Sequence, residues 1–300
     1  MTHTPPPTDD LVAAFQIEGW PLRGRIVRLG AAIDEVLSRH DYPEPVANLL
    51  GEACALAALV GSSLKFDGKL VVQAQGDGPV SLVVADYDTS GGLRGYCSFD
   101  AEAVAAASTG FARPGAQTLL GKGVFIMTID QGPDTDRYQG ITAIEGETLA
   151  LCAEQYFAQS EQTPTRVRLS VGQVDTGEGP RWRAGGILIQ NIAADEARGS
   201  TQDVWERAQA LFATTGEDEL IDPMLPGETL LWRLFNEDGV RVFEARPLKA
   251  FCRCSAERAA TVIQTFTPEE KAEMTEPDGK IHVKCEYCSR TYELVATPSA

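Results

Sequence analysis

"FCRCSA" at residues 251–256 and "VKCEYCSR" at residues 283–290 hold four of the seven cysteines, and this pattern decides the fold of the C-terminal part of the chain. The spacing is Cys-x-Cys, thirty residues, Cys-x-x-Cys. Four thiolates at tetrahedral positions satisfy Zn²⁺, and a turn between two strands commonly presents a Cys-x-x-Cys pair to one metal. The spacing therefore predicts a zinc site with four ligands: Cys252, Cys254, Cys285 and Cys288.

This cysteine-rich module is too short, at about fifty residues, to bury a core of its own. Zinc binding is worth on the order of 10–16 kcal/mol in small zinc peptides, so it would supply most of the folding free energy of the module. Ser255 is placed to cap a helix, and Thr267 with Glu270 has the form of a capping box. Residues 278–295 indicate two strands around the second cysteine pair. With four cysteines at hand, we expect His282 to face solvent rather than to bind the metal.

Metal-bound thiolates stay deprotonated, and oxidants such as peroxide can still attack them. Cysteines one or two residues apart can then close disulfides, which would release the metal and couple redox state to folding. A purely structural zinc knuckle is the alternative interpretation of the same pattern.

The chain has 300 residues, of which 43% are hydrophobic and 23% charged. This composition is typical of a soluble protein. The N-terminal "MTHTPPPTDD" lacks a basic start followed by an apolar segment, and no uncharged apolar run approaches the roughly 18–20 residues of a membrane span. We therefore expect a cytoplasmic protein, where paired cysteines are more often metal ligands or redox groups than permanent disulfides. The net charge of −17 argues against nucleic acid or an anionic membrane as a partner.

The first 193 residues are predicted to form an α+β domain, in which helices pack on a sheet of mostly antiparallel strands. A Gly-containing turn at residues 76–79 joins two strands into a hairpin. Apolar spacing predicts helices over residues 25–40, from Pro45 onward, and over 147–162, and strands over 69–75, 80–88, 123–130, 137–144, 165–174 and 185–192.

Residues 194–248 are predicted to form a helical connector of marginal stability. Between Asp195 and Gly239 there are eleven Asp or Glu against three Arg, a net charge of −8, so the segment repels itself. It also carries apolar residues at helical spacing, and an isolated helix of this length is marginal in water. We therefore expect it to dock on the first domain. Residues 249–300 then form the zinc-binding module.

No enzyme motif stands out: G-x-G-x-x-G, H-E-x-x-H and G-x-S-x-G are all absent from the sequence. Cys54, Cys97 and Cys152 are expected to be buried, inert thiols. One alternative function is a thiol-disulfide oxidoreductase that uses Cys285 and Cys288, although such a pair belongs at the start of a helix in a βαβ unit. A zinc-ribbon interaction module is another alternative, but its acidic charge is wrong for RNA or DNA.

Several stretches along the whole chain, together with the cysteine pairs, resemble the 33-kDa chaperonin family of redox-regulated heat-shock holdases. The stretches are "GWPLRGRIVRLG" (19–30), "HDYPEPVANLLGEA" (40–53), "LKFDGKLVVQAQGDGPV" (64–80), "RYQGI" (137–141), "EQYFAQSEQTPTRV" (154–167) and "ETLLWRLF" (228–235). They occur in the family's order from about Asp10 to Leu294. One departure is Ser289, which follows the last cysteine where glycine is frequent in the family.

The resemblance implies an ATP-independent cytoplasmic chaperone and not an enzyme. It implies that the reduced, zinc-bound form is inactive and that oxidants together with unfolding conditions activate it. The implied ligands are the same four cysteines, and the implied disulfides are Cys252–Cys254 and Cys285–Cys288. The connector would unfold with the zinc module and uncover a surface for unfolded client proteins, and the active form would be a homodimer.

Overall fold

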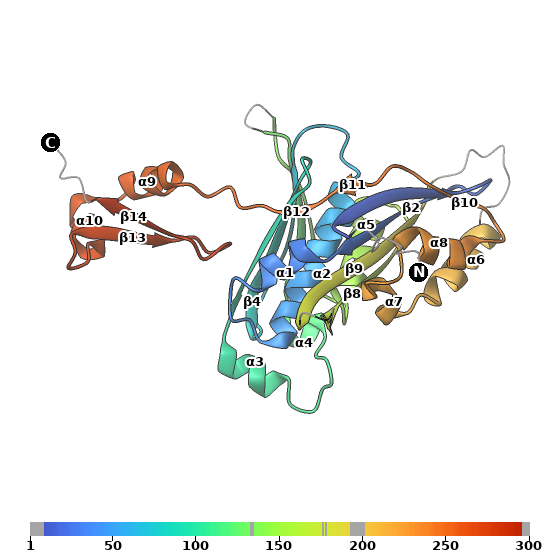
Figure 1. Cartoon of the computed structure of the whole chain (residues 1–300), viewed down its shortest axis with the longest axis horizontal. Coiled ribbons are helices and arrows are strands. Elements are labelled where there is room, and N and C mark those ends of the chain that lie inside the picture. Colours follow the sequence, from blue (N-terminus) through green and yellow to red (C-terminus); the bar gives the residue numbers. More distant parts are fainter. Residues whose placement is uncertain (1–8, 133–134, 176, 178, 193–201, 296–300) are drawn as a thin grey trace. The chain divides into compact units, whose positions relative to one another are not determined.

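The computed structural model describes residues 9–132, 135–175, 177, 179–192 and 202–295. The chain divides into two compact units, Met1–Ala250 and Phe251–Ala300, and each is considered by itself. The first unit contains two six-stranded sheets with helices packed against them, and the second contains a two-stranded sheet with two short helices (Figure 1). The mixed α+β class predicted from the sequence is confirmed.

The first sheet of the larger unit has the strand order β10-β1-β2-β9-β8, and β11 also pairs with β1. All of these pairings are antiparallel. Its strands are β1 (Leu11–Ile17), β2 (Leu22–Leu29), β8 (Thr165–Asp175), β9 (Pro180–Asn191), β10 (Val240–Val242) and β11 (Arg246–Pro247).

The second sheet has the order β12-β5-β4-β3-β6-β7 and contains the predicted hairpin as β3 and β4. Its pairings are antiparallel except for the parallel pair of β12 and β5. Its strands are β3 (Lys69–Gly76), β4 (Val80–Asp88), β5 (Gly92–Phe99), β6 (Gly123–Asp130), β7 (Tyr138–Ala143) and β12 (Lys249–Ala250).

Helix α2 (Glu44–Gly61) lies between the two sheets and forms the centre of the core (Figure 1). Its glycines allow close approach: a Cβ on Gly51 would collide with Val171 of the first sheet, and one on Gly61 with Tyr87 of the second. Within the described residues α2 is the one helix long and apolar enough to cross a membrane, but 78% of it is buried inside the unit, as in a core helix. The other helices around the sheets are α1 (Ala31–Leu37), α3 (Ala101–Ala107), α4 (Ala116–Leu120) and α5 (Leu149–Ser160).

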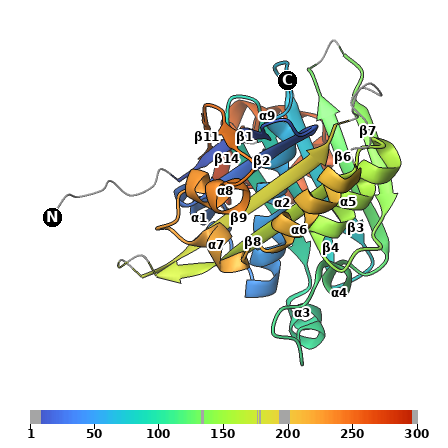
Figure 2. The same cartoon turned by 90° about the vertical axis from the view of Figure 1, so that its right-hand side faces the viewer.

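Three further helices cover the other face of the first sheet (Figure 2). They are α6 (Gln202–Ala213), α7 (Glu217–Ile221) and α8 (Gly227–Phe235), and they belong to the predicted connector. A second hydrophobic core joins them to the sheet, and it includes Phe15, Ile26, Ile189, Phe212 and Phe235. The docking of this segment on the first domain, as expected from its apolar residues, is therefore observed.

The smaller unit consists of α9 (Ala256–Gln264), α10 (Pro268–Met274), β13 (Lys280–Lys284) and β14 (Thr291–Val295). Ser255 caps α9, and Thr267 with Glu270 forms the predicted capping box of α10. Among the described residues of this unit, Ala259 and Ile281 are the buried apolar side chains. So small a core gives the unit little hydrophobic stabilisation.

The prediction of one helix over residues 25–40 is wrong in its first half. Residues 22–29 form strand β2, and the helix begins at Ala31. Strand β2 lies in the middle of a sheet that is covered on both faces, so Ile26 faces the connector helices while Val27 faces α2. Buried residues on both faces remove the alternation that marks a strand, and the apolar run then imitates helical spacing.

Candidate metal centre

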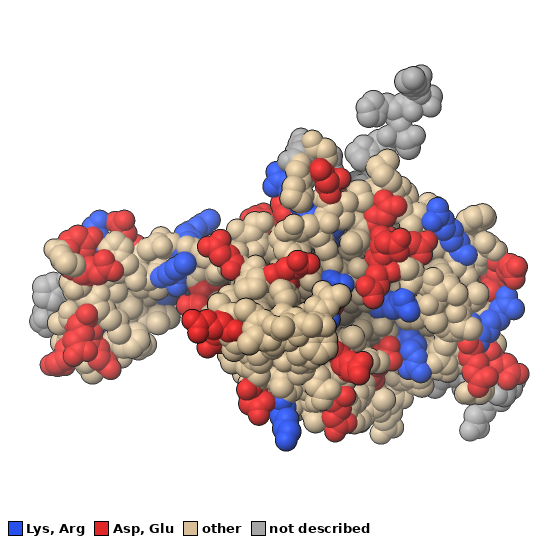
Figure 3. Space-filling model, turned by 90° about the horizontal axis from the view of Figure 1, so that it is seen from below, with Lys and Arg blue, Asp and Glu red and all other residues tan. Residues whose placement is uncertain are grey.

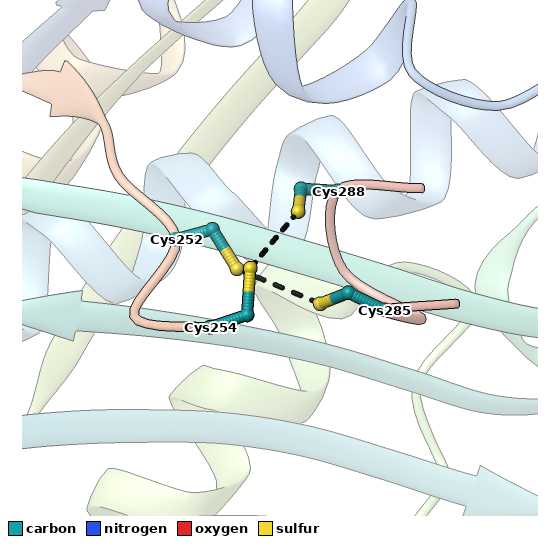
Figure 4. Close-up of side chains that lie close together, drawn as sticks. All are labelled: Cys252, Cys254, Cys285 and Cys288. Carbon is teal, nitrogen blue, oxygen red and sulfur yellow. Dashed lines mark hydrogen bonds between the residues drawn. The ribbon is translucent and has the colours of Figure 1, made fainter. Parts of the chain in front are cut away.

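Four cysteine sulfurs meet in the smaller unit, and they are the four predicted ligands, Cys252, Cys254, Cys285 and Cys288 (Figure 4). The four Sγ atoms all lie within 4.8 Å of one another. The distance from Cys252 Sγ to Cys285 Sγ is 3.7 Å, and from Cys254 Sγ to Cys288 Sγ it is 3.3 Å. All four side chains are partly exposed, so a metal ion or an oxidant has access to them.

Two short segments bring these sulfurs together. The first pair lies in the extended chain between β12 and α9, directly before the N-cap Ser255. The second pair lies in the turn between β13 and β14, as predicted, and Cys285 N donates to Arg290 O at 2.9 Å to close the turn. Ser289 has φ +56°, a conformation that favours glycine. A glycine would adopt this conformation freely, whereas serine carries a small conformational cost there.

Tyr292 is a contact of the site that the sequence analysis missed. Its hydroxyl donates a hydrogen bond to Cys254 Sγ at 3.1 Å. Tyr292 pairs with Val283 across the hairpin, next to the turn that carries the second cysteine pair. Its position four residues after Cys288 is the signal that identifies it, because a side chain near the start of the second strand stays close to the turn.

The thiols differ in their acidity. Burial opposes ionisation of Cys254, but hydrogen bonds from Tyr292 and from the neighbouring thiols outweigh it and lower the pKa of Cys254 to about 7. Burial, reinforced by the neighbouring thiols, raises the pKa of Cys288 to about 12. Burial also raises the pKa of Cys252. Metal binding demands thiolates, and Cys254 reaches that state most readily of these three.

The donor set fits zinc. A tetrahedral site with Zn–S bonds of about 2.3 Å has sulfurs about 3.8 Å apart, and here the distances are 3.7 Å between Cys252 and Cys285 and 3.3 Å between Cys254 and Cys288, with all four sulfurs within 4.8 Å. Four thiolates without carboxylate or carbonyl donors favour Zn²⁺ over hard cations. His282 lies outside this set, and its Nε2 is 3.0 Å from Asp278 Oδ2, consistent with the expectation that it does not bind the metal.

The two predicted disulfides, Cys252–Cys254 and Cys285–Cys288, stay predictions. All seven cysteines are free thiols here. The Sγ···Sγ contacts at 3.7 Å and 3.3 Å join cysteines of different pairs, and all four sulfurs lie within 4.8 Å of one another. Formation of the predicted disulfides would replace this four-sulfur cluster with one S–S bond within each pair.

The remaining cysteines, Cys54, Cys97 and Cys152, are buried in the larger unit, as predicted. Burial raises the pKa of Cys54 to about 12 and also raises the pKa values of Cys97 and Cys152. A buried thiol that resists ionisation is a poor nucleophile, which supports their interpretation as inert core residues.

Known proteins of one family match this chain along nearly its whole length. The model of the family described as "Hsp33 protein" matches residues 10–295. A 33 kDa chaperonin of Caulobacter vibrioides is 76% identical over 297 residues, which cover 98% of each chain. One of Escherichia coli is 36% identical over 286 residues, 95% of this chain and 92% of its relative.

A solved structure, that of the 33 kDa chaperonin (heat shock protein 33 homolog) of Thermotoga maritima, has the same fold. Its TM-score is 0.79 at 23% sequence identity, and the match covers 96% of this chain and 95% of that one. The family match and the relatives support a chaperone role. From residue 10 to residue 295, this chain belongs to the Hsp33 family.

Proposed function

We propose that this protein is a redox-regulated, ATP-independent holdase of the cytoplasm that binds unfolding proteins under oxidative stress. The observation that carries the proposal is the convergence of four thiols in a unit with almost no apolar core, in a chain of a chaperonin family. Zinc bound by Cys252, Cys254, Cys285 and Cys288 supplies most of the folding free energy of residues 249–300.

Oxidation of the four thiolates is the switch. Each pair, Cys252 with Cys254 and Cys285 with Cys288, loses two electrons and forms one S–S bond. Each oxidation consumes one hydrogen peroxide, whose O–O bond breaks, and two protons convert the reduced peroxide into two waters. Sulfurs joined in disulfides no longer serve as thiolate ligands, so the zinc is released and the unit loses its main source of stability.

When the zinc-binding unit unfolds, the connector, residues 194–248, is released from the first domain. Its three helices, α6, α7 and α8, cover apolar residues of the first sheet, among them Phe15, Ile26 and Ile189. Undocking exposes both this face and the apolar faces of the helices, and a contiguous apolar surface is what an unfolding client protein binds. The net charge of −8 between Asp195 and Gly239, within the connector, favours release and helps to keep the complex soluble.

The active form is proposed to be a homodimer, with unfolded or oxidatively damaged proteins as partners. Nucleic acid and membranes are not expected as partners because the chain carries a net charge of −17. Acidic side chains are spread over the face shown in Figure 3, and its described part carries no broad basic area.

The protein is proposed not to be an enzyme. A thiol-disulfide oxidoreductase that uses Cys285 and Cys288 is the alternative, but these residues lie between two strands rather than at the start of a helix. Many turnovers of a small disulfide substrate per protein molecule would favour that alternative over the holdase.

The decisive experiment follows zinc release and the light scattering of a heat-denatured client, before and after treatment with peroxide at elevated temperature. We expect the reduced, zinc-loaded protein to leave aggregation unchanged and the oxidised protein to suppress it in step with zinc release, without ATP. Equal protection by the reduced form would contradict the redox gate, and no protection by either form would contradict the holdase function.

A further inference from the structure

Helix α7 is the shortest described helix of the connector, and it packs on strands β8 and β9 of the first sheet (Figure 2). A helix of this length does not persist alone in water, and the last four carbonyl groups of any α-helix have no partner within it. Of the five described residues of α7, Leu220 alone is buried. So little apolar packing leaves much of the attachment of α7 to polar contacts.

Two buried arginines of the first sheet donate hydrogen bonds to the carbonyl end of α7. Arg28 of β2 donates from Nη1 to Glu219 O at 3.0 Å and from Nη2 to Asp222 O. Arg183 of β9 donates from Nε to Ile221 O at 2.7 Å. Both arginines are only 5% exposed. They satisfy carbonyl groups that the end of a helix leaves without partners, and their positive charge suits the negative end of the helix dipole.

Asp9 fixes the position of the two arginines. Its carboxylate accepts hydrogen bonds from Arg183 Nη1 at 2.8 Å and from Arg183 Nη2 at 2.7 Å, and Arg28 Nε lies 3.8 Å from Asp9 Oδ1. A bidentate pair of this kind sets the orientation of a guanidinium group. The next residue, Asp10, accepts a hydrogen bond from Gly30 N at 2.9 Å, which ties this segment to the core domain. We call Arg28, Arg183 and Asp9 the arginine site, and none of these three residues belongs to the connector.

A glycine in the sheet allows α7 to come this close. A Cβ on Gly185 of β9 would lie 2.0 Å from Leu220 O, and the three atoms nearest to it would all belong to Leu220. Gly185 is paired with Arg28 on the neighbouring strand, so it lies directly beside the arginine site. Glycine inside a strand often marks the close approach of another backbone. The sheet is therefore shaped to receive the backbone of α7.

We propose that the arginine site, together with the backbone at Gly185, is a recognition site for the carbonyl end of a helix, and that α7 is its ligand within the chain. Undocking of α7 breaks three hydrogen bonds from charged guanidinium groups at once. Such bonds are stronger than those between neutral groups, so the occupied site holds the connector on the core domain and sets how easily the connector is released. The control of chaperone activation rests on the proposed function, whereas the recognition of α7 does not.

The test measures hydrogen exchange in variants of the full-length, reduced, zinc-loaded protein. Arg28→Lys keeps the positive charge but loses the planar group that donates to two carbonyl oxygens. We expect the amides of α7 and α8 to exchange about tenfold faster or more, because loss of a hydrogen bond from a charged group shifts an equilibrium by about that factor. The amides of α2 should keep their protection, which a general loss of stability would not allow.

Gly185→Ala tests the same site by another route. The added Cβ meets the backbone of α7 and leaves every arginine donor in place. The amides of α7 and α8 should again exchange about tenfold faster or more, while those of α2 keep their protection. Arg94→Lys is the matched control: it removes a guanidinium group that pairs with Asp86 at 2.6 Å in the second sheet. It should leave the exchange of α7 and α8 unchanged.

Selective acceleration in both Arg28→Lys and Gly185→Ala supports the recognition site. Unchanged exchange of α7 and α8 in either variant would overturn it. Equal acceleration of the α2 amides would also overturn it, because these residues would then have a general role in stability.

Client protection separates this site from the proposed function. Under fixed peroxide, Arg28→Lys and Gly185→Ala should suppress client aggregation at a lower temperature than the unaltered protein and Arg94→Lys. Faster exchange of the connector with an unchanged activation temperature would overturn the control of release by this site. Faster exchange in a protein that protects no client in any state would support the recognition site and contradict the proposed function.

Discussion

Individual side chains decide what the four-cysteine cluster can do. The Tyr292 hydroxyl stabilises the Cys254 thiolate, whereas the thiol of Cys288 is held protonated by burial until a metal displaces its proton. Before a metal binds, the site therefore already contains one thiol, Cys254, that ionises readily. Binding the metal must release protons from the other thiols, so its affinity rises with pH.

Removal of one ligand tests the assignment of the site. Cys285→Ser is expected to bind zinc poorly, because a serine hydroxyl does not replace a thiolate on Zn²⁺. If the proposed switch is correct, this variant also protects clients without full oxidation. Zinc content after purification under thiol protection is the measurement. His282→Gln is the control, since His282 lies outside the cluster, and it should keep one zinc per chain. A normal zinc content in Cys285→Ser would contradict the ligand assignment.

Because Glu52 is buried, we expect the stability of the larger unit to depend on pH. Burial raises the pKa of Glu52 to about 7 from an ordinary 4.5, against the opposing effect of Arg113. The folded protein then holds this proton at pH values where the unfolded chain has lost it. The stabilisation is complete below about pH 4.5 and is lost as the pH rises through about 7.

Glu52→Gln should therefore be more stable than the unaltered protein at pH 8, by on the order of 1–2 kcal/mol, and the difference should shrink or reverse at pH 5. Thermal unfolding at several pH values measures it. Glu44→Gln, at an exposed position in the first turn of the same helix, serves as the control and should show no such trend between pH 6 and 8. A constant difference for Glu52→Gln would show that the carboxyl is ionised throughout.

At the scale of the element, helix α8 shows how the connector is held. One of its faces buries Leu230, Leu231, Leu234 and Phe235 in the second hydrophobic core, while Trp232 on the other face is 61% exposed. A helix of nine residues is too short to persist alone in water, so this packing is what keeps it folded. Loss of a single buried side chain should therefore shift the balance between docked and released states.

Leu231→Ala is expected to cost about 2–4 kcal/mol of docking free energy through the lost contacts and the cavity left behind. Hydrogen exchange of the α8 amides should accelerate accordingly, and under fixed peroxide the variant should suppress client aggregation at a lower temperature. Trp232→Ala is a matched truncation on the exposed side of the same helix and should change exchange little. Equal effects of the two variants would contradict the idea that the docking of α8 controls activation.

At the scale of the whole molecule, the two units are stabilised by different means. The larger unit has two extensive hydrophobic cores, whereas the described part of the smaller unit buries only Ala259 and Ile281 among its apolar residues. Hydrophobic burial is a large source of stability for the first, and we expect a metal bound by the four cysteines to be the main source for the second. Such a division allows one unit to unfold while the other remains folded.

Removal of zinc by a chelator under reducing conditions should therefore unfold the smaller unit alone. The amides of β13 and β14 are expected to lose their protection from hydrogen exchange, because the lost metal-binding free energy, on the order of 10–16 kcal/mol, exceeds what this unit gains from burial. The amides of α2 should stay protected and provide the internal control. A metal-free protein with a protected hairpin would refute the dependence of the unit on zinc.

Features that depend on neighbours along the chain could be predicted from the sequence. The predicted caps at Ser255 and Thr267 are confirmed, and so is the turn between β3 and β4. All three depend on residues that are neighbours in the sequence. The spacing of apolar residues predicts the α+β class, and the spacing of the cysteines predicts their cluster.

Features that depend on contacts between residues far apart in the sequence could not be predicted from local patterns. The apolar spacing of strand β2 predicts a helix because burial on both faces hides the alternation of a strand. The strands β10, β11 and β12 are two or three residues long and exist only because β1 and β5 provide edges for pairing. The hydrogen bond from Tyr292 to Cys254 likewise joins residues far apart in the sequence. Local patterns report what a segment prefers, but which distant side chains meet is set by the packing of the whole fold.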